Sequence, residues 1–260
     1  MNIKRTSLQI MRDTVHALMM REIKTRFGSN RLGYFWALAE PIAQAGIMAL
    51  MFSLIGRSSV SGIPVALFLL VGILPFKMFS KLLPQLSAAV EANKGLLSYR
   101  QVSAIDPIIT RIIIEAATFL IVYCLLMGFM AWLGFAVIPD NFLAVLYASS
   151  LLIIISVGLG LMLCSAVTYW KDISKVVGMI TMPMMILSGV MFCATMIPPQ
   201  YWYLFDWNPI FHAVELSRDG YFSAYSTPIG DWQYLELCAF ISFSLGLMTF
   251  HLNRMRFITT

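Results

Sequence analysis

The amino-acid sequence predicts an all-α integral membrane protein with six transmembrane helices, an N-terminal interfacial amphipathic helix and an external re-entrant helical hairpin before the last span. Three observations predict this fold class. Hydrophobic residues make up 59% of the 260 residues and charged residues only 12%, whereas about a quarter of a soluble domain is charged. The mean hydropathy is +0.79. Long apolar runs alternate with short connections, and basic residues gather in every second connection.

Six apolar runs are predicted to cross the bilayer, because each has close to the roughly 20 residues that a membrane helix needs. They are residues 36–56, 63–83, 108–136, 142–168, 176–197 and 234–252. Lys77 and Lys81 leave the cytoplasmic end of the second run uncertain. Pro183 is expected to kink the fifth run without dividing it, since neighbouring helices can satisfy the carbonyl that a proline frees.

The distribution of basic residues predicts the orientation. Every Lys and Arg except Arg57 and Arg218 lies in residues 1–34, in or beside the connection between the second and third runs, between the fourth and fifth, or after the sixth. Basic residues favour the cytoplasmic side of a membrane. The sequence therefore predicts a multi-pass protein with both termini in the cytoplasm.

Residues 1–34 are predicted to form a cytoplasmic helix that lies in the membrane interface, ahead of a spanning domain at 35–260. Its apolar residues recur at helical spacing: Leu8, Met11, Val15, Met19, Ile23 and Phe27. A basic amphipathic helix of this kind can lie among anionic headgroups. Gly28 and Gly33 would let the chain turn, and Pro41 is expected in an early turn of the first span, where a missing N–H costs little.

The cytoplasmic segment 87–103 is too polar to span and too apolar for a solvated loop. A short helix is expected around residues 87–98. Leu96, Leu97 and Tyr99 then support two interpretations: a helix packed beneath its own bundle, or a docking element for a cytosolic partner.

The external connection, 196–233, is rich in aromatic residues between Tyr201 and Tyr225. Asn208 and Pro209 form a favourable helix start and Gly220 a favourable stop, which predicts a helix over 209–219. Glu215 and Arg218, three residues apart, are expected to pair. We expect a re-entrant or interfacial hairpin over 198–225. Its rings could anchor the chain at the interface, or line the mouth of a path, because aromatic faces pack on sugar rings.

No catalytic or metal-binding constellation is visible. His16, His212 and His251 are not spaced with acidic residues or Cys as metal ligands are, and four scattered cysteines are best explained as small buried hydrophobes. The chain lacks a P-loop, so any ATP must be hydrolysed by a separate subunit. Few ionisable residues lie within spans (Arg111, Glu115 and Glu236), which disfavours an ion-coupled secondary transporter.

Two stretches resemble a known family. RLGYFWALAEP at 31–41 and NPIFHAVELSRDGYF at 208–222 are similar to the permease subunit of type-2 ABC exporters, in particular the capsular polysaccharide export permeases of Gram-negative bacteria. The resemblance covers nearly the whole chain. Its motif residues are Leu32, Gly33, Trp36, Pro41, Asn208, Pro209, Glu215, Leu216 and Arg218.

The resemblance implies a homodimeric permease in the bacterial inner membrane, bound to two copies of a cytosolic ATPase that holds the ATP and Mg, with no cofactor in this chain. It also implies a periplasmic co-polymerase-type adaptor, an outer-membrane channel and a polysaccharide substrate that crosses between the permease copies; no nucleic acid is expected. The implied ATPase-coupling residues are Glu91, Asn93, Lys94, Leu96, Leu97, Tyr99 and Arg100. By position and type, the path residues would be Tyr34, Trp36, Tyr201, Trp202, Tyr203, Trp207 and Tyr225.

Alternative functions remain open at this point. Within the same family, the substrate could be O-antigen, teichoic acid or a drug. In other classes, the chain could be an ion-coupled secondary transporter or a membrane-embedded enzyme, although a visible acid–base set is lacking.

Overall fold

The computed structural model describes residues 6–28, 33–54, 56, 59–60, 62–99 and 101–259, with side chains described except at 26–28, 33–35, 37, 38, 258 and 259. The protein is mostly helical. Its longer helices are α1 (Ser7–Gly28), α2 (Gly33–Leu54), α3 (Val65–Ser87), α4 (Asp106–Trp132), α5 (Phe142–Val167), α6 (Ile173–Leu187), α7 (Pro209–Tyr221) and α8 (Trp232–Leu252). Shorter elements are β1 (Ser59–Val60), β2 (Ile63–Pro64), η1 (Glu91–Leu96), η2 (Ala194–Met196), η3 (Pro199–Leu204) and α9 (Arg256–Thr259).

The four helices α3, α4, α5 and α8 are long and apolar enough to cross a membrane, as judged by length and composition. The apolar parts of α2 and α6, Ala39–Leu54 and Ile173–Leu187, are shorter. Each of the six apolar runs predicted from the sequence therefore falls on a helix. The antiparallel strands β1 and β2, which pair Val60 with Ile63, close the short turn between α2 and α3.

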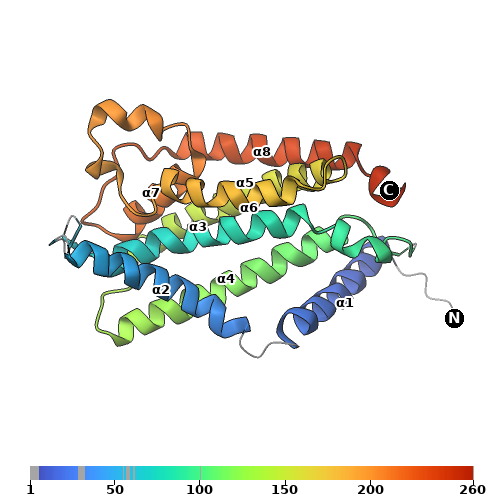
Figure 1. The fold of residues 1–260 in the computed structure, drawn as a ribbon, viewed down its shortest axis with the longest axis horizontal. Coiled ribbons are helices and arrows are strands. Elements are labelled where there is room, and N and C mark those ends of the chain that lie inside the picture. Colours follow the sequence, from blue (N-terminus) through green and yellow to red (C-terminus); the bar gives the residue numbers. More distant parts are fainter. Residues whose placement is uncertain are drawn as a thin grey trace.

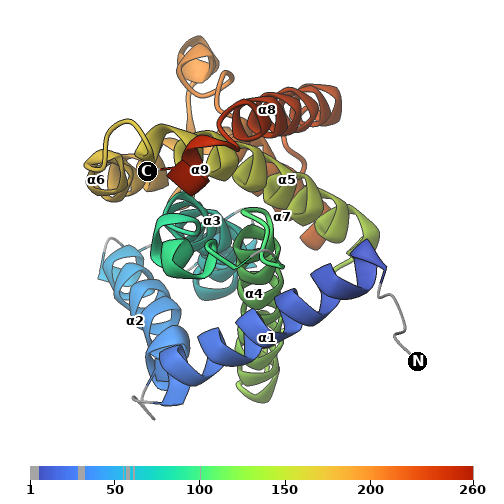
Figure 2. The same cartoon turned by 90° about the vertical axis from the view of Figure 1, so that its right-hand side faces the viewer.

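The long helices run side by side along the long axis of the molecule, and α1 crosses one end of the bundle (Figure 1, Figure 2). Helix α3 is buried along most of its length, and its Leu69 and Leu74 share a core with Leu152 and Ile155 of α5. The outer faces of α4 and α8 carry exposed Leu120, Ile121, Phe240 and Ile241. Such exposed apolar faces indicate a lipid environment rather than water.

The contact between α5 and α8 depends on two glycines. An ideal Cβ on Gly158 would lie 2.3 Å from the backbone of Ser242, and one on Gly246 would lie 2.4 Å from the carbonyl oxygen of Gly158. Small residues let membrane helices approach closely enough for their backbones to touch. These two positions therefore fix how α8 sits on the bundle.

Three local expectations were wrong. Helix α2 begins at Gly33, three residues before the predicted start at 36, so Pro41 lies in its third turn, where its missing N–H removes a helical hydrogen bond. Helix α6 ends at Leu187, ten residues before the predicted end at 197, because Gly189 adopts a left-handed backbone conformation (φ 66°). The short cytoplasmic helix is the 3₁₀ turn η1, which begins only at Glu91.

We predict that Gly158→Val separates α5 from α8 and lowers the free energy of unfolding by about 1–3 kcal/mol, the usual cost of overpacking. Thermal unfolding of the purified protein in detergent measures the loss. Gly128→Val is the matched control, since a Cβ on Gly128 meets nothing within 4 Å. Equal losses in both variants would contradict the close approach.

Candidate functional site

The start of α7 lies next to the end of α6 in space, and the side chain of Asn208 bonds to both helices. The Asn208 side chain accepts the N–H of Ile210 at 3.0 Å and so caps α7, while Pro209 occupies the first turn. Its amide nitrogen donates to the carbonyl oxygen of Leu187 at 3.0 Å. The predicted helix over 209–219 is thus confirmed, and its cap also satisfies one of the carbonyls left free at the end of α6.

Arg218 holds the turn that follows α6. Its Nη1 donates to the carbonyl oxygens of Gly189 and Phe192, both at 2.7 Å, and its Nη2 donates to that of Val190 at 2.8 Å. Nη1 also lies 3.3 Å from Oε1 of Glu215, and both side chains are fully buried. The predicted pairing of Glu215 with Arg218 is confirmed. The guanidinium also binds three backbone carbonyls that are left without helical partners after α6 ends.

Helix α3 provides the floor of this site. The Arg218 guanidinium lies 4.0 Å from the centre of the Phe68 ring, a cation–π contact. A Cβ on Gly72 would lie 2.3 Å from Nη2 of Arg218. Gly72 therefore leaves the space that Arg218 occupies, a role that no feature of the apolar run 63–83 reveals.

Glu215 binds the segment that leads to α8. Its Oε2 accepts hydrogen bonds from the Tyr225 hydroxyl, from Thr227 Oγ1 at 3.1 Å and from the N–H of Ala194 at 3.3 Å. Burial and the Glu215 carboxylate raise the pKa of Tyr225, so its phenol keeps the proton that it donates. Glu215 and Arg218 together tie the turn after α6 and residues 225–227 to α7.

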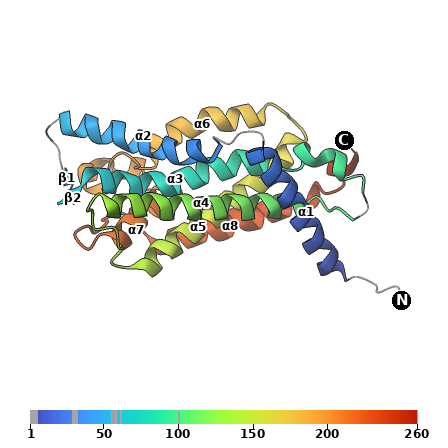
Figure 3. The ribbon, with the colours of Figure 1, turned by 90° about the horizontal axis from the view of Figure 1, so that it is seen from below.

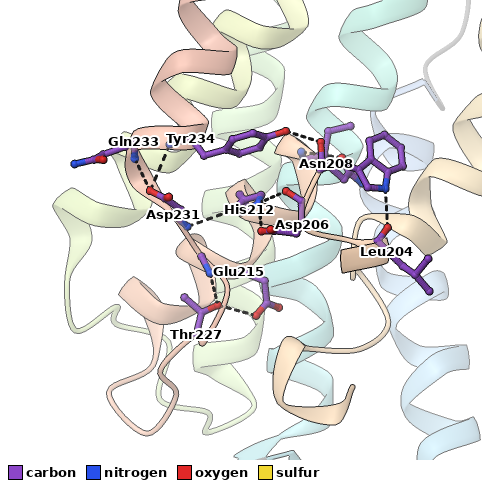
Figure 4. A network of polar contacts seen from close by, with 12 residues as sticks. Leu204, Asp206, Asn208, His212, Glu215, Thr227, Asp231, Gln233 and Tyr234 are labelled. Atoms are coloured by element: carbon purple, nitrogen blue, oxygen red, sulfur yellow. Dashed lines mark hydrogen bonds and ion pairs between the residues drawn. The ribbon is translucent and has the colours of Figure 1, made fainter. Parts of the chain in front are cut away.

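His212 adds a second link, which Figure 4 shows with its neighbours. Its Nε2 lies 2.8 Å from the carbonyl oxygen of Asp206, and its Nδ1 accepts the N–H of Asp231 at 3.1 Å. The ring also packs against Tyr234, with centroids 4.7 Å apart. His212 thus joins the end of η3 to the start of α8. We call Asn208, His212, Glu215 and Arg218 the α7 latch.

The end of the bundle that α1 crosses contains the segment predicted to couple to an ATPase. Asn93 of η1 is buried, donates to the carbonyl oxygen of Ala89 at 2.8 Å and accepts from Arg21 of α1. Nε of Arg111 on α4 lies 3.1 Å from Oε1 of Glu22 on α1. These two polar contacts attach α1 to η1 and α4. The apolar spacing within residues 1–34 does not reveal either contact.

A groove of about 950 Å³ opens between α1 and the segment after η1. Ile10, Leu18, Leu96 and Val102 supply apolar lining, and Arg21 and Asp13 supply charge. Figure 2 shows α1 passing across this end of the bundle. The groove combines residues of the predicted coupling segment with the helix that precedes the first span.

The predicted coupling residues divide by exposure. Glu91, Lys94 and Tyr99 are exposed, and Leu96 is half-buried. Leu97 is only 8% exposed and packs in a core cluster of the bundle itself, and Asn93 is also buried. Arg100 lies outside the described residues. The packed interpretation of the segment therefore holds for Leu97 and Asn93. Tyr99 and Leu96 line the groove, and docking of a partner there stays a prediction.

The predicted path residues do not form one cluster. Trp36 is 64% exposed and lies in the first turn of α2, a different helix from those formed by residues 201–225. Tyr201, Tyr203 and Trp207 are exposed on and beside η3. Trp202 is half-buried, and its indole N–H donates to the carbonyl oxygen of Ile197 at 3.0 Å. The Tyr34 side chain lies outside those that the structure describes.

Tyr225, the remaining path residue, is 3% exposed and belongs to the hydrogen bonds of Glu215. Of the family-motif residues, Asn208, Glu215 and Arg218 form the α7 latch, Leu216 packs in the core and Leu32 lies outside the described residues. A role for any of these residues in a path or in coupling stays a prediction.

Comparison with known proteins identifies the family. A family model described as "ABC-2 type transporter" matches residues 13–222, from α1 through α7. The chain belongs to the ABC-2 type transporter family. The α7 latch and most residues that line the groove beside α1 lie within the matched range.

Relatives of this ABC-2 transporter chain align over most of its length. It is 36% identical to the polysialic acid transport protein KpsM of Escherichia coli over 98% of the chain and 99% of that protein. It is 32% identical to the capsule polysaccharide export inner-membrane protein CtrC of Neisseria meningitidis, over 93% and 91% respectively. With BexB of Haemophilus influenzae, another capsule polysaccharide export inner-membrane protein, identity is 29% over 83% and 82%.

We predict that Arg218→Met lowers the free energy of unfolding by about 3–5 kcal/mol, because it leaves Glu215 as a buried unpaired charge. Glu215→Gln should cost less, since Arg218 would keep its three carbonyl partners. Thermal unfolding in detergent, together with protease cleavage between α6 and α8, measures both.

The control for these variants is Lys175→Met, which removes an exposed ion pair to Asp172 and should cost at most about 1 kcal/mol. A loss in Arg218→Met no larger than in Lys175→Met would show that the α7 latch does not hold this region.

Proposed function

We propose that this chain is the membrane permease subunit of an ATP-driven exporter that moves a capsular polysaccharide across the bacterial inner membrane. The observation that carries the substrate class is the match to relatives named for capsule polysaccharide or polysialic acid transport, which extends over nearly the full length of both chains. A shared short motif would support only the family; a match of this extent supports a shared cargo class.

The proposed topology has six crossings, formed by α2, α3, α4, α5, α6 and α8, with both termini in the cytoplasm. The basic residues of α1, the 88–105 segment, the α5–α6 turn and the C-terminal end support this orientation. Helix α6 has 15 residues, about 22 Å of helix at a rise of about 1.5 Å per residue. It is therefore shorter than a hydrocarbon core of about 30 Å.

The remainder of the fifth crossing would be made by residues 188–198. Non-helical backbone is tolerated at membrane depth only where protein covers it and satisfies its polar groups. Arg218 does this for three carbonyls, and Glu215 does it for the N–H of Ala194. The α7 latch thereby supports a re-entrant external hairpin formed by η3 and α7.

The proposed partners are two copies of a cytosolic ATPase, which bind ATP and Mg, and a second copy of this chain. Exposed Tyr99 and half-buried Leu96 would contact the ATPase in the groove beside α1. A periplasmic adaptor and an outer-membrane channel would carry the polymer onward. The path itself would lie between the two permease copies.

In the proposed mechanism, closure of the ATPase dimer pushes η1. The Arg21–Asn93 contact would pass the movement to α1, and the Arg111–Glu22 ion pair would pass it to α4. At the other end, the α7 latch keeps the external hairpin attached to α3 while the helices rock. Exposed rings such as Tyr201, Tyr203 and Trp207 would offer a sugar chain repeated weak contacts that do not stall it.

The function can be tested in cells that synthesise the polymer. Deletion of this chain should abolish surface polymer and cause polymer to accumulate in the cytoplasm, and expression of the chain should restore export. Replacement of the P-loop Lys of the partner ATPase should reproduce the deletion. Antibody labelling of surface polymer and assay of polymer in lysed cells measure both.

Brief collapse of the proton gradient at maintained ATP separates this function from the ion-coupled alternative. We expect export to continue during the collapse. Export that stops with the gradient, yet survives loss of the ATPase, would favour a secondary transporter.

We predict that Leu96→Glu combined with Tyr99→Glu releases the ATPase from membranes, because charge would replace the apolar contact in the groove. The permease should remain inserted, and co-purification of the two subunits measures the effect. Ile138→Glu is the matched control, since Ile138 is an exposed apolar residue at the other end of the bundle. Retention of the ATPase by the double variant would exclude this docking surface.

A further inference from the structure

A second groove lies at the cytoplasmic end, on the side of α8. It has a volume of about 630 Å³ and separates the last two turns of α8 from the loop before α4. Leu247, Met248 and Ile105 form its apolar wall, while His251, Arg254 and Ser103 form its polar end. Figures 1 and 3 show that α8 ends, and α4 begins, at the end of the bundle where α1 lies.

The apolar wall continues a face that has no protein cover in the described chain. Leu247 and Met248 are 43% and 60% exposed, and exposed Phe240 and Ile241 lie further along the same helix. Helix α8 is long and apolar enough to cross a membrane. An acyl chain that lies along α8 can therefore enter the groove without leaving the lipid phase.

The polar end of the groove contains two basic side chains. His251 and Arg254 are three residues apart and both are exposed. Among the described residues, no hydrogen bond or ion pair involves the Arg254 side chain. The nearby Asp106 carboxylate is buried and accepts the N–H of Ser103 at 2.8 Å. Two other cations at this end, Lys175 and Arg256, are engaged: Lys175 pairs with Asp172, and Arg256 covers the Tyr169 ring.

We infer that this groove binds an anionic glycerophospholipid of the cytoplasmic leaflet. Its phosphate would take hydrogen bonds from the Arg254 guanidinium and the His251 imidazole, and one acyl chain would lie on Leu247 and Met248. Basic pockets beside transmembrane helices at the cytoplasmic surface are suited to anionic headgroups, since charge attraction adds to apolar burial. The inference rests on the cytoplasmic orientation proposed for the end of α8 and is independent of the exported polymer.

Lipid binding to the purified full-length chain tests the inference. The chain in mild detergent is titrated with phosphatidylglycerol or with phosphatidylcholine of the same acyl composition, and bound lipid is counted by native mass spectrometry. Phosphatidylglycerol should bind more tightly than phosphatidylcholine. Arg254→Gln should weaken phosphatidylglycerol binding about fivefold, which corresponds to the contribution of one cation near an anionic headgroup. His251→Gln should weaken it further in the double variant.

Lys175→Gln is the matched control, because it removes one positive charge from the same end of the molecule outside the groove. It should leave phosphatidylglycerol binding unchanged. Leu247→Asp should weaken both lipids, and glycerol 3-phosphate alone should fail to compete. Equal binding of the two lipids, or an equal effect of Arg254→Gln and Lys175→Gln, would overturn the inference. Neither result would bear on export, since the measurement needs neither the ATPase nor the polymer.

Discussion

The half of the bundle that contains α7 depends on one buried guanidinium, that of Arg218. Where α6 stops at Leu187, the chain leaves several carbonyls without helical partners in a part of the molecule that is shielded from water. Arg218 satisfies three of them, and Glu215 balances its charge while accepting hydrogen bonds from the next segment. A neutral side chain could not supply both the donors and their rigid planar geometry. The break in α6 is therefore stable because α7 carries an arginine at this position.

Buried polar side chains that find distant partners also hold the end of the bundle where α1 lies. Asn93 and Arg111 are polar side chains on elements packed into the bundle, and each finds its partner on α1. Helix α1 is thus bonded both to η1 and to the spanning candidate α4. In the proposed exporter, α1 would transmit movement, since it contacts both the coupling segment and a spanning helix.

Between these ends, the helices are held together by close packing at glycines. Gly158 and Gly246 bring α5 and α8 into backbone contact, and Gly72 makes room for Arg218 on α3. Apolar residues cover the outer faces of α4 and α8, where lipid replaces water. The polar contacts described above therefore lie at the two ends of the bundle. In the proposed exporter, the ATPase would act at one of these ends and the polymer would meet the other.

The sequence by itself determined the membrane class, the six apolar runs, the cap and extent of α7, and the pairing of Glu215 with Arg218. These features depend on composition and on residues close together in the chain, so local patterns reveal them. Only the tertiary structure decided that α6 stops at Leu187, that Leu97 faces inward while Tyr99 faces outward, and that Tyr225 is buried on Glu215. It also decided that Glu22 meets Arg111 and that Gly72 accommodates Arg218. Each of these depends on partners far apart in sequence, and hydropathy, which averages over neighbours along the chain, carries no information about which distant side chains meet.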